Sequence, residues 1–257
     1  RVLFRSETAS VIDTAPIAST TAVATSNVGT YPITASGGTD NNYTFTYTAG
    51  TLTVNKATLT ATADNKTRAY GDANPAFTIT YSGFKNNETS SVVDTPPAAS
   101  TTATVTSGVG TYPISVSGGT DNNYTFTYAS GTLTIAQALL TATADNKSRL
   151  YGDANPAFTI SYSGFKNNET ASVLDSAPAA SSAATVTSNV GTYPISVSGG
   201  QDNNYSFSYT AGTLTINKAT LAVTADNKAR LYGDANPTFT ASYTDRKSTR
   251  LNSSHRT

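Results

Sequence analysis

The sequence predicts a mostly β chain, built as a tandem array of modules about 81 residues long. The first observation behind this prediction is a set of short markers that recur at one constant spacing. Among them, YGDANP begins at Tyr70, Tyr151 and Tyr232, and GTLT begins at Gly50, Gly131 and Gly212. The second is a regular alternation of apolar residues with Thr and Ser, and the third is turn-forming sequence between the alternating stretches. Because the spacing shows no insertion or deletion, each period is a structural module.

The repeat defines the module boundaries. We expect two complete modules at 57–137 and 138–218, which match at about four in five positions. Residues 7–56 are the C-terminal part of a module, and residues 219–244 are the N-terminal part of another. No Gly, Ser or Pro spacer separates the modules, so we expect a fairly stiff rod.

The two ends of the chain depart from the repeat. Residues 1–6 and 245–257 have no counterpart in the modules and resemble in-frame translations of sequencing-library adapters. We therefore expect both stretches to be artefacts and the natural protein to continue beyond them. Residues 7–244 then hold 10 basic and 15 acidic residues, a net charge of −5, where the full chain has 16 of each.

Each module begins with strands. Leu59, Ala61 and Ala63 alternate with threonines, which places apolar side chains on one face of a strand. The YGDANP turn follows, with a glycine, turn-forming Asp and Asn, and a proline that keeps the preceding residue extended. It leads into a second strand that carries Phe77, Ile79 and Tyr81 on one face.

The segment after the second strand predicts one short helix. Asn87 is a candidate N-cap, and Glu88 lies where a helix start favours negative charge. Val92 and Val93 would cover the core, and Pro96-Pro97 would end the helix, which we expect to span one or two turns.

The rest of the module predicts strands, which brings the total to about six. Ala103 and Val105 alternate in one strand, and Tyr112, Ile114 and Val116 alternate in the next. Pro113 has no amide hydrogen to donate, so this strand should be an edge or carry a bulge. Residues 124–128 and 133–135 are expected to form a hairpin through a turn at 129–131.

Composition excludes several function classes. Residues 7–244 contain no His, Cys, Met or Trp, because the single histidine is His255. Thiol nucleophiles, histidine acid–base catalysis, disulfides and His or Cys zinc sites are therefore absent from this stretch. No basic cluster suits nucleic acid, and no apolar run reaches the roughly 18 residues that a membrane span needs. We predict no enzyme, no cofactor and no metal site.

Two features are candidates for binding. Phe84 and its counterpart Phe165 lie in loops, outside the alternating pattern, and are expected to seal a contact between modules or to touch a ligand. The other aromatic residues fall in phase with aliphatic ones and predict core packing. The Asp121-Asn122-Asn123 loop carries oxygens of the kind that calcium uses, but turn formation is the favoured interpretation.

The order of the motifs carries a resemblance to a known family. The succession of ATLTATADNK, YGDANP, GTYPISVSGG, NNYTFTY and GTLTI resembles the MBG domain of the YG-containing type. This family forms tandem arrays in large secreted or surface-attached bacterial proteins. The resemblance implies a β-grasp-like fold with one short helix, and an immunoglobulin-like sandwich is the alternative. It implies no catalytic residues.

The resemblance and the repeat together predict function. We expect a non-catalytic stalk or spacer in a bacterial cell-surface or secreted adhesin, so that the chain lies outside the cell. Its partners would be the neighbouring modules and possibly host or environmental glycans. A glycan- or mucin-binding array, in which each module binds ligand, is the first alternative. An accessory region of a large secreted enzyme is the second.

Overall fold

The computed structural model describes residues 9–245, which form two compact units. The first unit contains the chain up to Arg68 and Asp72–Ala136, and the second contains Ala69–Gly71 and the chain from Gln137 onward. Residues 1–6 and 246–257, expected to be artefacts, lie outside the described residues. Asp245 is the last residue of a strand.

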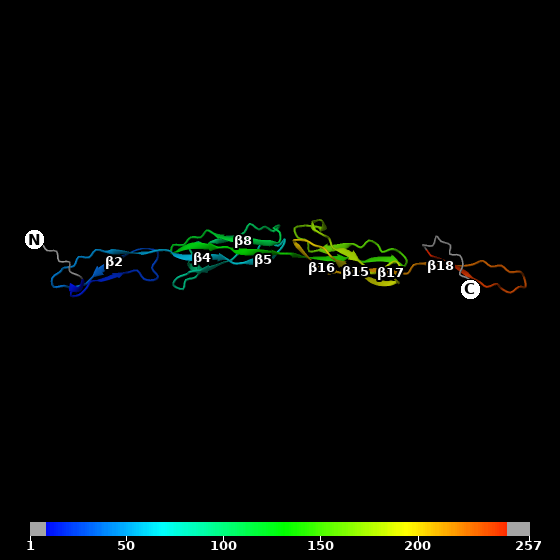
Figure 1. The fold of residues 1–257 in the computed structure, drawn as a ribbon, viewed down its shortest axis with the longest axis horizontal. Coiled ribbons are helices and arrows are strands. Elements are labelled where there is room, and N and C mark those ends of the chain that lie inside the picture. The colour runs from blue at the N-terminus through cyan, green and yellow to red at the C-terminus, as the bar shows by residue number, and fades with distance from the viewer. Residues whose placement is uncertain (1–8, 246–257) are drawn as a thin grey trace. The chain divides into compact units, whose positions relative to one another are not determined.

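The described residues are mostly strand, and Figure 1 shows the sheets of each part. In the first unit the strands are β1 (Ile17–Thr20), β2 (Gly29–Ser36), β3 (Gly50–Val54), β4 (Ala57–Ala63), β5 (Lys66–Ala69), β6 (Ile79–Ser82), β7 (Ala98–Ser100), β8 (Gly110–Ser117), β9 (Tyr124–Ala129) and β10 (Gly131–Ala136), the last residue of β5 belonging to the second unit. In the second unit they are β11 (Ala138–Ala144), β12 (Lys147–Leu150), β13 (Ile160–Ser163), β14 (Ala179–Ser181), β15 (Gly191–Ser198), β16 (Tyr205–Thr210), β17 (Gly212–Asn217), β18 (Leu221–Ala225) and β19 (Ala241–Asp245).

Each complete repeat contains two sheets that pack face to face. Residues 138–218 form a three-stranded sheet in the order β13-β11-β16 and a four-stranded sheet in the order β12-β17-β15-β14. Apolar side chains from β11 meet those from β15 and β17 in one core, which includes Ala142, Ile195 and Leu214. Residues 57–137 repeat this arrangement with β6-β4-β9 and β5-β10-β8-β7. The architecture is a β-sandwich of seven strands.

The partial repeats at the two ends form smaller sheets. Strands β1, β2 and β3 form a three-stranded sheet in that order, and β18 pairs with β19 in a two-stranded sheet. The first matches β7, β8 and β10 of the complete repeat, and the second matches β4 and β6. Within residues 9–245, neither sheet has the opposing sheet that covers its apolar face in a complete repeat.

The first and last strands of a repeat lie next to each other, and each continues from one sheet into the other. Strand β11 pairs in parallel with β16, and its continuation β12 pairs in parallel with β17. The change of sheet occurs at Asp145-Asn146 in the first strand and at Ala211 in the last. Asn146 Oδ1 accepts a hydrogen bond of 2.8 Å from the Thr213 amide, which holds the two crossing points together.

A glycine makes this crossing possible. A Cβ atom on Gly131 would lie 2.4 Å from the carbonyl oxygen of Ala63, closer than atoms can pack, and Gly212 meets Ala144 in the same way. The glycine that opens GTLT is therefore required by the close approach of two backbones. Residues 124–128 and 133–135 consequently lie in different sheets, so the predicted hairpin is wrong.

The predicted helix and the β-grasp fold are also not found. Residues Ser90–Val92 form a single 3-10 turn, with Thr89 before it making no side-chain cap. The reason lies upstream, where Asn86 and Asn87 adopt φ values of 53° and 60°, in the left-handed region. A turn of this kind redirects the chain, so Asn87 is not a helix cap. Glu88 accepts a hydrogen bond from the Tyr124 hydroxyl instead of lying at a helix start.

Two strand predictions need smaller corrections. Residues 103–105 form a loop and not a strand, although Ala103 is buried. Strand β8 lies between β10 and β7, so it is not an edge strand. Pro113 pairs with Thr132 but lies beyond the end of β7, which pairs only with Ser115–Ser117. Proline has no amide hydrogen to donate, and this is tolerated because at Pro113 strand β8 has β10 as a neighbour on one side but not β7 on the other.

The alternation predicted in β4 and β10 is confirmed. Leu59, Ala61 and Ala63 are buried in β4, and Leu133 and Ile135 are buried in β10. Small side chains such as alanine form much of this core.

We predict that the crossing glycines are needed for stability. Replacing Gly131 by alanine should lower the free energy of unfolding by about 1–3 kcal/mol, because the added Cβ forces the crossing strands apart. Gly50 is the matched control, since its Cβ would meet nothing closer than 3.7 Å. Denaturant unfolding of Gly131→Ala and Gly50→Ala measures both, and equal effects would contradict the crossing model.

Candidate functional site

The best-defined binding geometry in the chain surrounds Tyr70, the tyrosine of the first YGDANP segment. This residue belongs to the second compact unit and is only 5% exposed. Its hydroxyl donates a hydrogen bond of 2.6 Å to Glu169 Oε1. Its ring meets the ring of Tyr205 edge to face, with centroids 5.5 Å apart. Tyr70 is therefore held by one charge-assisted hydrogen bond and one aromatic contact.

Tyr70 fits into a socket that is formed by Lys166, Glu169 and Tyr205. Tyr205 begins β16, and its hydroxyl donates 2.6 Å to Glu169 Oε2 while it accepts 2.8 Å from the Lys166 amide. Both oxygens of the Glu169 carboxylate thus bind a tyrosine hydroxyl. The hydrogen bond to Glu169 and burial raise the pKa of Tyr70, and burial, then that same carboxylate, raise the pKa of Tyr205.

The glycine after Tyr70 is part of the same contact. A Cβ atom on Gly71 would lie 2.2 Å from the Cβ of Lys166. The corresponding atom on Gly152 or Gly233 would meet nothing within 4 Å. All three glycines have positive φ, so the turn needs glycine in each copy, but only Gly71 lies against a neighbouring side chain.

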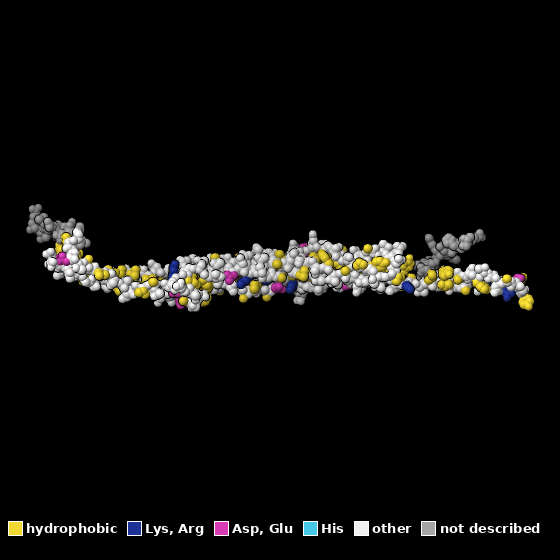
Figure 2. Space-filling view, turned by 90° about the horizontal axis from the view of Figure 1, so that it is seen from below, with side chains coloured by type: hydrophobic (Ala, Val, Ile, Leu, Met, Phe, Trp, Pro, Cys, Tyr) yellow, Lys and Arg dark blue, Asp and Glu magenta, His cyan; other side chains and the backbone are white. Residues whose placement is uncertain are grey.

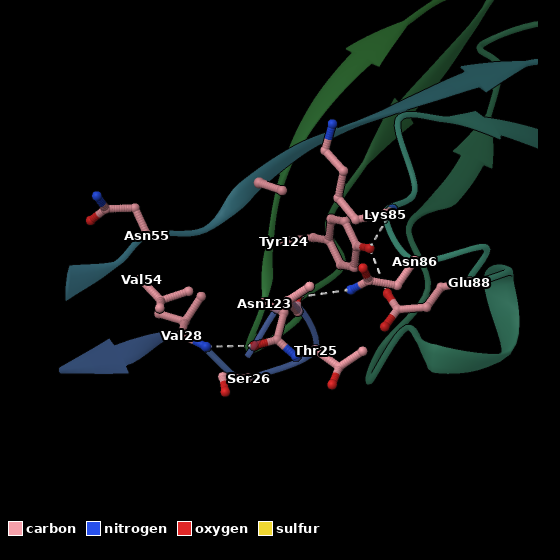
Figure 3. A pocket seen from close by; sticks show the side chains of 12 residues that line it. Thr25, Ser26, Val28, Val54, Asn55, Lys85, Asn86, Glu88, Asn123 and Tyr124 are labelled. Carbon is pink, nitrogen blue, oxygen red and sulfur yellow. Dashed lines mark hydrogen bonds between the residues drawn. The ribbon is translucent and has the colours of Figure 1, made fainter. Parts of the chain in front are cut away.

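Residues 57–137 carry a second socket of the same construction, shown in Figure 3. Tyr124 donates 2.5 Å to Glu88 Oε2 and accepts 2.9 Å from the Lys85 amide. These groups line a pocket of about 120 Å³, which residues 24–26 and Val28 of the preceding repeat also border. Asn123 Oδ1 accepts 2.9 Å from the Val28 amide, and Asn86 donates 3.3 Å to the Ala24 carbonyl.

The predicted site residues Phe84 and Phe165 lie behind these sockets. Phe165 meets Tyr205 edge to face with centroids 5.4 Å apart, and Phe84 meets Tyr124 at 5.6 Å. Phe84 also packs against the small core that contains Leu59 and Val93. Both phenylalanines support the tyrosine that forms the socket. A direct role for either in binding stays a prediction.

A buried arginine, which the sequence interpretation did not identify, holds the YGDANP loop. Arg149 donates from Nε to Asn155 Oδ1 at 2.8 Å and from a terminal nitrogen to the Thr185 carbonyl. Asn155 in turn donates 2.7 Å to the Ala184 carbonyl. Arg68 and Asn74 repeat this network in the first unit. The available signal was an arginine repeated at the same position of every module, two residues after a repeated lysine.

Asp121, whose loop was considered for calcium, has a structural role, and so does Asp64. Asp121 Oδ1 accepts hydrogen bonds from the amides of Asn123 and Tyr124, at 2.7 and 2.9 Å. Asp64 accepts from the hydroxyls of Thr78 and Thr80, which lower its pKa. Over residues 9–245, no group of three His, Cys, Asp or Glu side chains could hold a metal ion.

One aromatic residue in each repeat departs from the predicted burial. Tyr128 follows Tyr124 and Phe126 on β9, yet it is about half exposed and donates its hydroxyl to the Gly118 carbonyl. Its ring stacks on Phe126 with centroids 6.4 Å apart. The core-packing interpretation therefore holds for Tyr124 but not for Tyr128.

Comparison with known proteins identifies the repeats. The sequence model of the family described as MBG domain (YGX type) matches residues 2–53, 59–134, 140–215 and 221–249. The outer matches extend into the stretches expected to be artefacts. No curated protein sequence matches the chain. Within the described part of the chain, no helix has the length and apolar character to cross a membrane.

The Tyr70 contact predicts a dependence on pH. A tyrosine whose pKa is raised by folding adds stability below its ordinary pKa of 10.0 and loses it as the pH rises through the folded value. We expect the free energy of unfolding of the second unit to fall above pH 10.0 more steeply than in Tyr70→Phe. Denaturant unfolding across alkaline pH measures this, and identical curves would contradict the contact.

The buried arginine gives a second prediction. Arg149→Met should lower the stability of the second unit by about 1–3 kcal/mol, because it leaves half-buried acceptors without a donor. Arg230 makes the equivalent bond to Asn236 at 2.8 Å but is exposed. Arg230→Met is therefore the control and should change stability by less than about 0.5 kcal/mol. Similar losses in thermal unfolding would argue against a specific role for the buried network.

Proposed function

Because this chain belongs to the MBG domain family of the YGX type, we propose that it is a non-catalytic spacer segment of a bacterial cell-surface or secreted adhesin. Repeats of this family are typical of extracellular proteins, and the family is not a catalytic one. In this proposal the repeats provide reach, and the tyrosine socket around Glu169 binds a residue of the repeat before it.

The observation that carries the proposal is the placement of Tyr70. It comes from the repeat at residues 57–137, and its hydroxyl and ring are bound by Glu169 and Tyr205 of the next repeat. A single linker residue, Gln137, separates β10 from β11. Repeats that follow one another with so short a connection are what a spacer requires.

The surface chemistry supports the same proposal. Figure 2 shows a face on which charged side chains are few and scattered, and most atoms belong to uncharged polar side chains or to the backbone. Such a surface suits a segment that separates other domains. If the chain is instead an accessory region of a large secreted enzyme, the same properties would suit a spacer beside the catalytic domain.

A glycan-binding array is the second candidate, and one observation favours it. Both complete repeats and the partial repeat at residues 7–56 carry a pair of nearly parallel aromatic rings in which the tyrosine is about half exposed. The pairs are Phe45 and Tyr47, Phe126 and Tyr128, and Phe207 and Tyr209. Exposed rings can stack on the apolar face of a sugar, so a glycan array probed with the whole chain tests this candidate. Loss of any signal in the Tyr128→Ala, Tyr209→Ala double variant would assign binding to these rings.

We predict that breaking the Tyr70 contact makes the spacer flexible. Tyr70→Ala should make the repeats at 57–137 and 138–218 reorient more freely, because it removes the hydrogen bond to Glu169 and the ring contact with Tyr205. Small-angle X-ray scattering of the whole chain measures the spread of molecular dimensions, and NMR relaxation measures the tumbling of each repeat. Tyr151→Ala alters the same turn in the next repeat and is the control. A Tyr70→Ala chain as rigid as the unchanged one would refute the fixed-spacer proposal.

A second experiment addresses reach. The chain is placed between a surface anchor and a reporter domain, and a version without residues 57–218 is prepared for comparison. The whole chain should hold the reporter farther from the surface. Equal accessibility of the two reporters to a surface-bound probe would count against a spacer.

A further inference from the structure

We propose that the second complete repeat carries a binding site for a neutral sugar, in a polar pocket beside Phe207. The pocket lies wholly within the second compact unit and has a volume of about 410 Å³. Small-molecule sites typically have volumes of roughly 300–1,000 Å³. The inference goes beyond the spacer proposal and rests on the glycan-binding candidate, for which it names a site and a class of sugar. The lining includes Gln137, Asp175, Gln201, Asp202, Asn203 and Phe207.

A hydrogen bond that closes this place in the preceding repeats is absent from the second complete repeat. The Asn122 amide donates 3.0 Å to Asp94 Oδ2, and the partial repeat before it has the same bond, also of 3.0 Å. The equivalent bond from Asn203 to Asp175 is not formed. Within the described part of the chain, the Asp175 carboxylate accepts no hydrogen bond. A charged acceptor is therefore open to a ligand at this pocket.

Two glutamines line the pocket in this repeat alone. Gln137 takes the place of a lysine, and Gln201 takes the place of a threonine. A glutamine side chain both donates and accepts hydrogen bonds. Gln137 donates from Nε2 to the Asp202 carbonyl at 3.0 Å. Its Oε1 accepts no hydrogen bond from residues 9–245. The residues at these positions in the other repeats are Lys56, Lys218, Thr39 and Thr120.

Hydrogen bonds within the loop fix the walls of the pocket. Asp202 Oδ1 accepts two backbone amides, at 2.7 and 2.9 Å. Two backbone hydrogen bonds, of 3.0 and 2.9 Å, join Ser176 to Gln201. Tyr209 donates its hydroxyl to the Gly199 carbonyl, next to the pocket. Because these contacts place the polar groups before a ligand arrives, they reduce the ordering cost of binding.

The chemistry of the lining suits a neutral sugar. A sugar has hydroxyl groups, which donate to carboxylates and accept from amides, and an apolar face of C–H groups. Asp175 and the glutamines match the hydroxyl groups, and the half-buried ring of Phe207 matches the apolar face. Two of the lining residues are acidic and none is basic, so the pocket repels sugars that carry carboxylate or sulfate groups.

The pocket adjoins the exposed aromatic ring of the same repeat. Phe207 lies parallel to Tyr209, with ring centroids 6.3 Å apart. Tyr209 is about half exposed. The pocket therefore adds hydrogen-bonding groups to the aromatic pair on which the glycan-binding candidate rests.

NMR titration of the isotope-labelled whole chain tests the proposal. The probes are the methyl glycosides of glucose, galactose, mannose and N-acetylglucosamine. At least one of them should shift the amide signals of Gln137, Gln201 and Asn203, with a dissociation constant in the millimolar range. N-Acetylneuraminic acid, which carries a carboxylate, should shift none of them.

A double variant, Gln137→Lys with Gln201→Thr, restores the residues of the other repeats. It should keep the fold, because Lys56 makes the equivalent contact, 2.7 Å from Nζ to the Asp121 carbonyl. It should weaken sugar binding about tenfold or more, because two amide groups are lost from the pocket.

Asp175→Asn should also weaken binding about tenfold, because a charged acceptor becomes a neutral one. Asp94→Asn is the matched control, since it changes the equivalent carboxylate where the hydrogen bond from Asn122 already occupies it. Binding to the control should equal binding to the unchanged chain.

The proposal is overturned if none of the four glycosides shifts the signals of these three pocket residues. Undiminished affinity in the double variant would overturn it as well. The same holds if N-acetylneuraminic acid binds as tightly as the neutral sugars, or if calcium ions alone cause the same shifts.

These outcomes are separable from those of the two proposed functions. A glycan-array signal that survives Gln137→Lys with Gln201→Thr, but is lost in the Tyr128→Ala, Tyr209→Ala variant, keeps the glycan-binding candidate and rejects this pocket. The rigidity of the Tyr70→Ala chain tests the spacer alone.

Discussion

The structure depends on one constraint, which is that the first and last strands of each repeat run parallel and change sheets at the same level. Parallel neighbours point in the same direction, so the chain enters a repeat at one end of the sandwich and leaves it at the opposite end. An antiparallel arrangement would return the chain to its starting end. The short connection between β10 and β11 follows from this constraint, because the next repeat begins where the previous one ends.

The core of each sandwich is built largely from small side chains. Alanine contributes several of the buried positions, including Ala142 and Ala144, so each sheet offers little apolar surface. Small side chains let the two sheets approach closely, and polar side chains fix the loops at the edges. Asp121, Asp64 and Arg149 each bind two or more groups that would otherwise lack partners. The many Asn, Asp and Thr residues of the repeat are thus part of its internal hydrogen bonding.

The sequence was sufficient for the features that follow from local pattern. The alternation in β4, β8 and β10 was visible because side chains on a strand point to opposite faces in turn. The helix was mispredicted because Asn87 and Glu88 satisfy capping preferences that the left-handed backbone at Asn86 and Asn87 overrides. The hairpin was mispredicted because Gly131 indicates a turn locally, while its function is to admit a second backbone. The glutamate at the socket has no local signature, since its partners Tyr70 and Tyr205 are 99 and 36 residues distant from Glu169.

The parallel pairing has a mechanical consequence. When the two ends of a repeat are pulled apart, the load falls on its first and last strands, which are hydrogen-bonded to each other. Since these strands lie along the direction of pulling, the ladder between β11 and β16 and that between β12 and β17 are loaded in shear. Their hydrogen bonds share the force and must fail together, whereas a hairpin pulled at its open end separates one bond at a time. Each repeat is therefore arranged to resist tension along the chain.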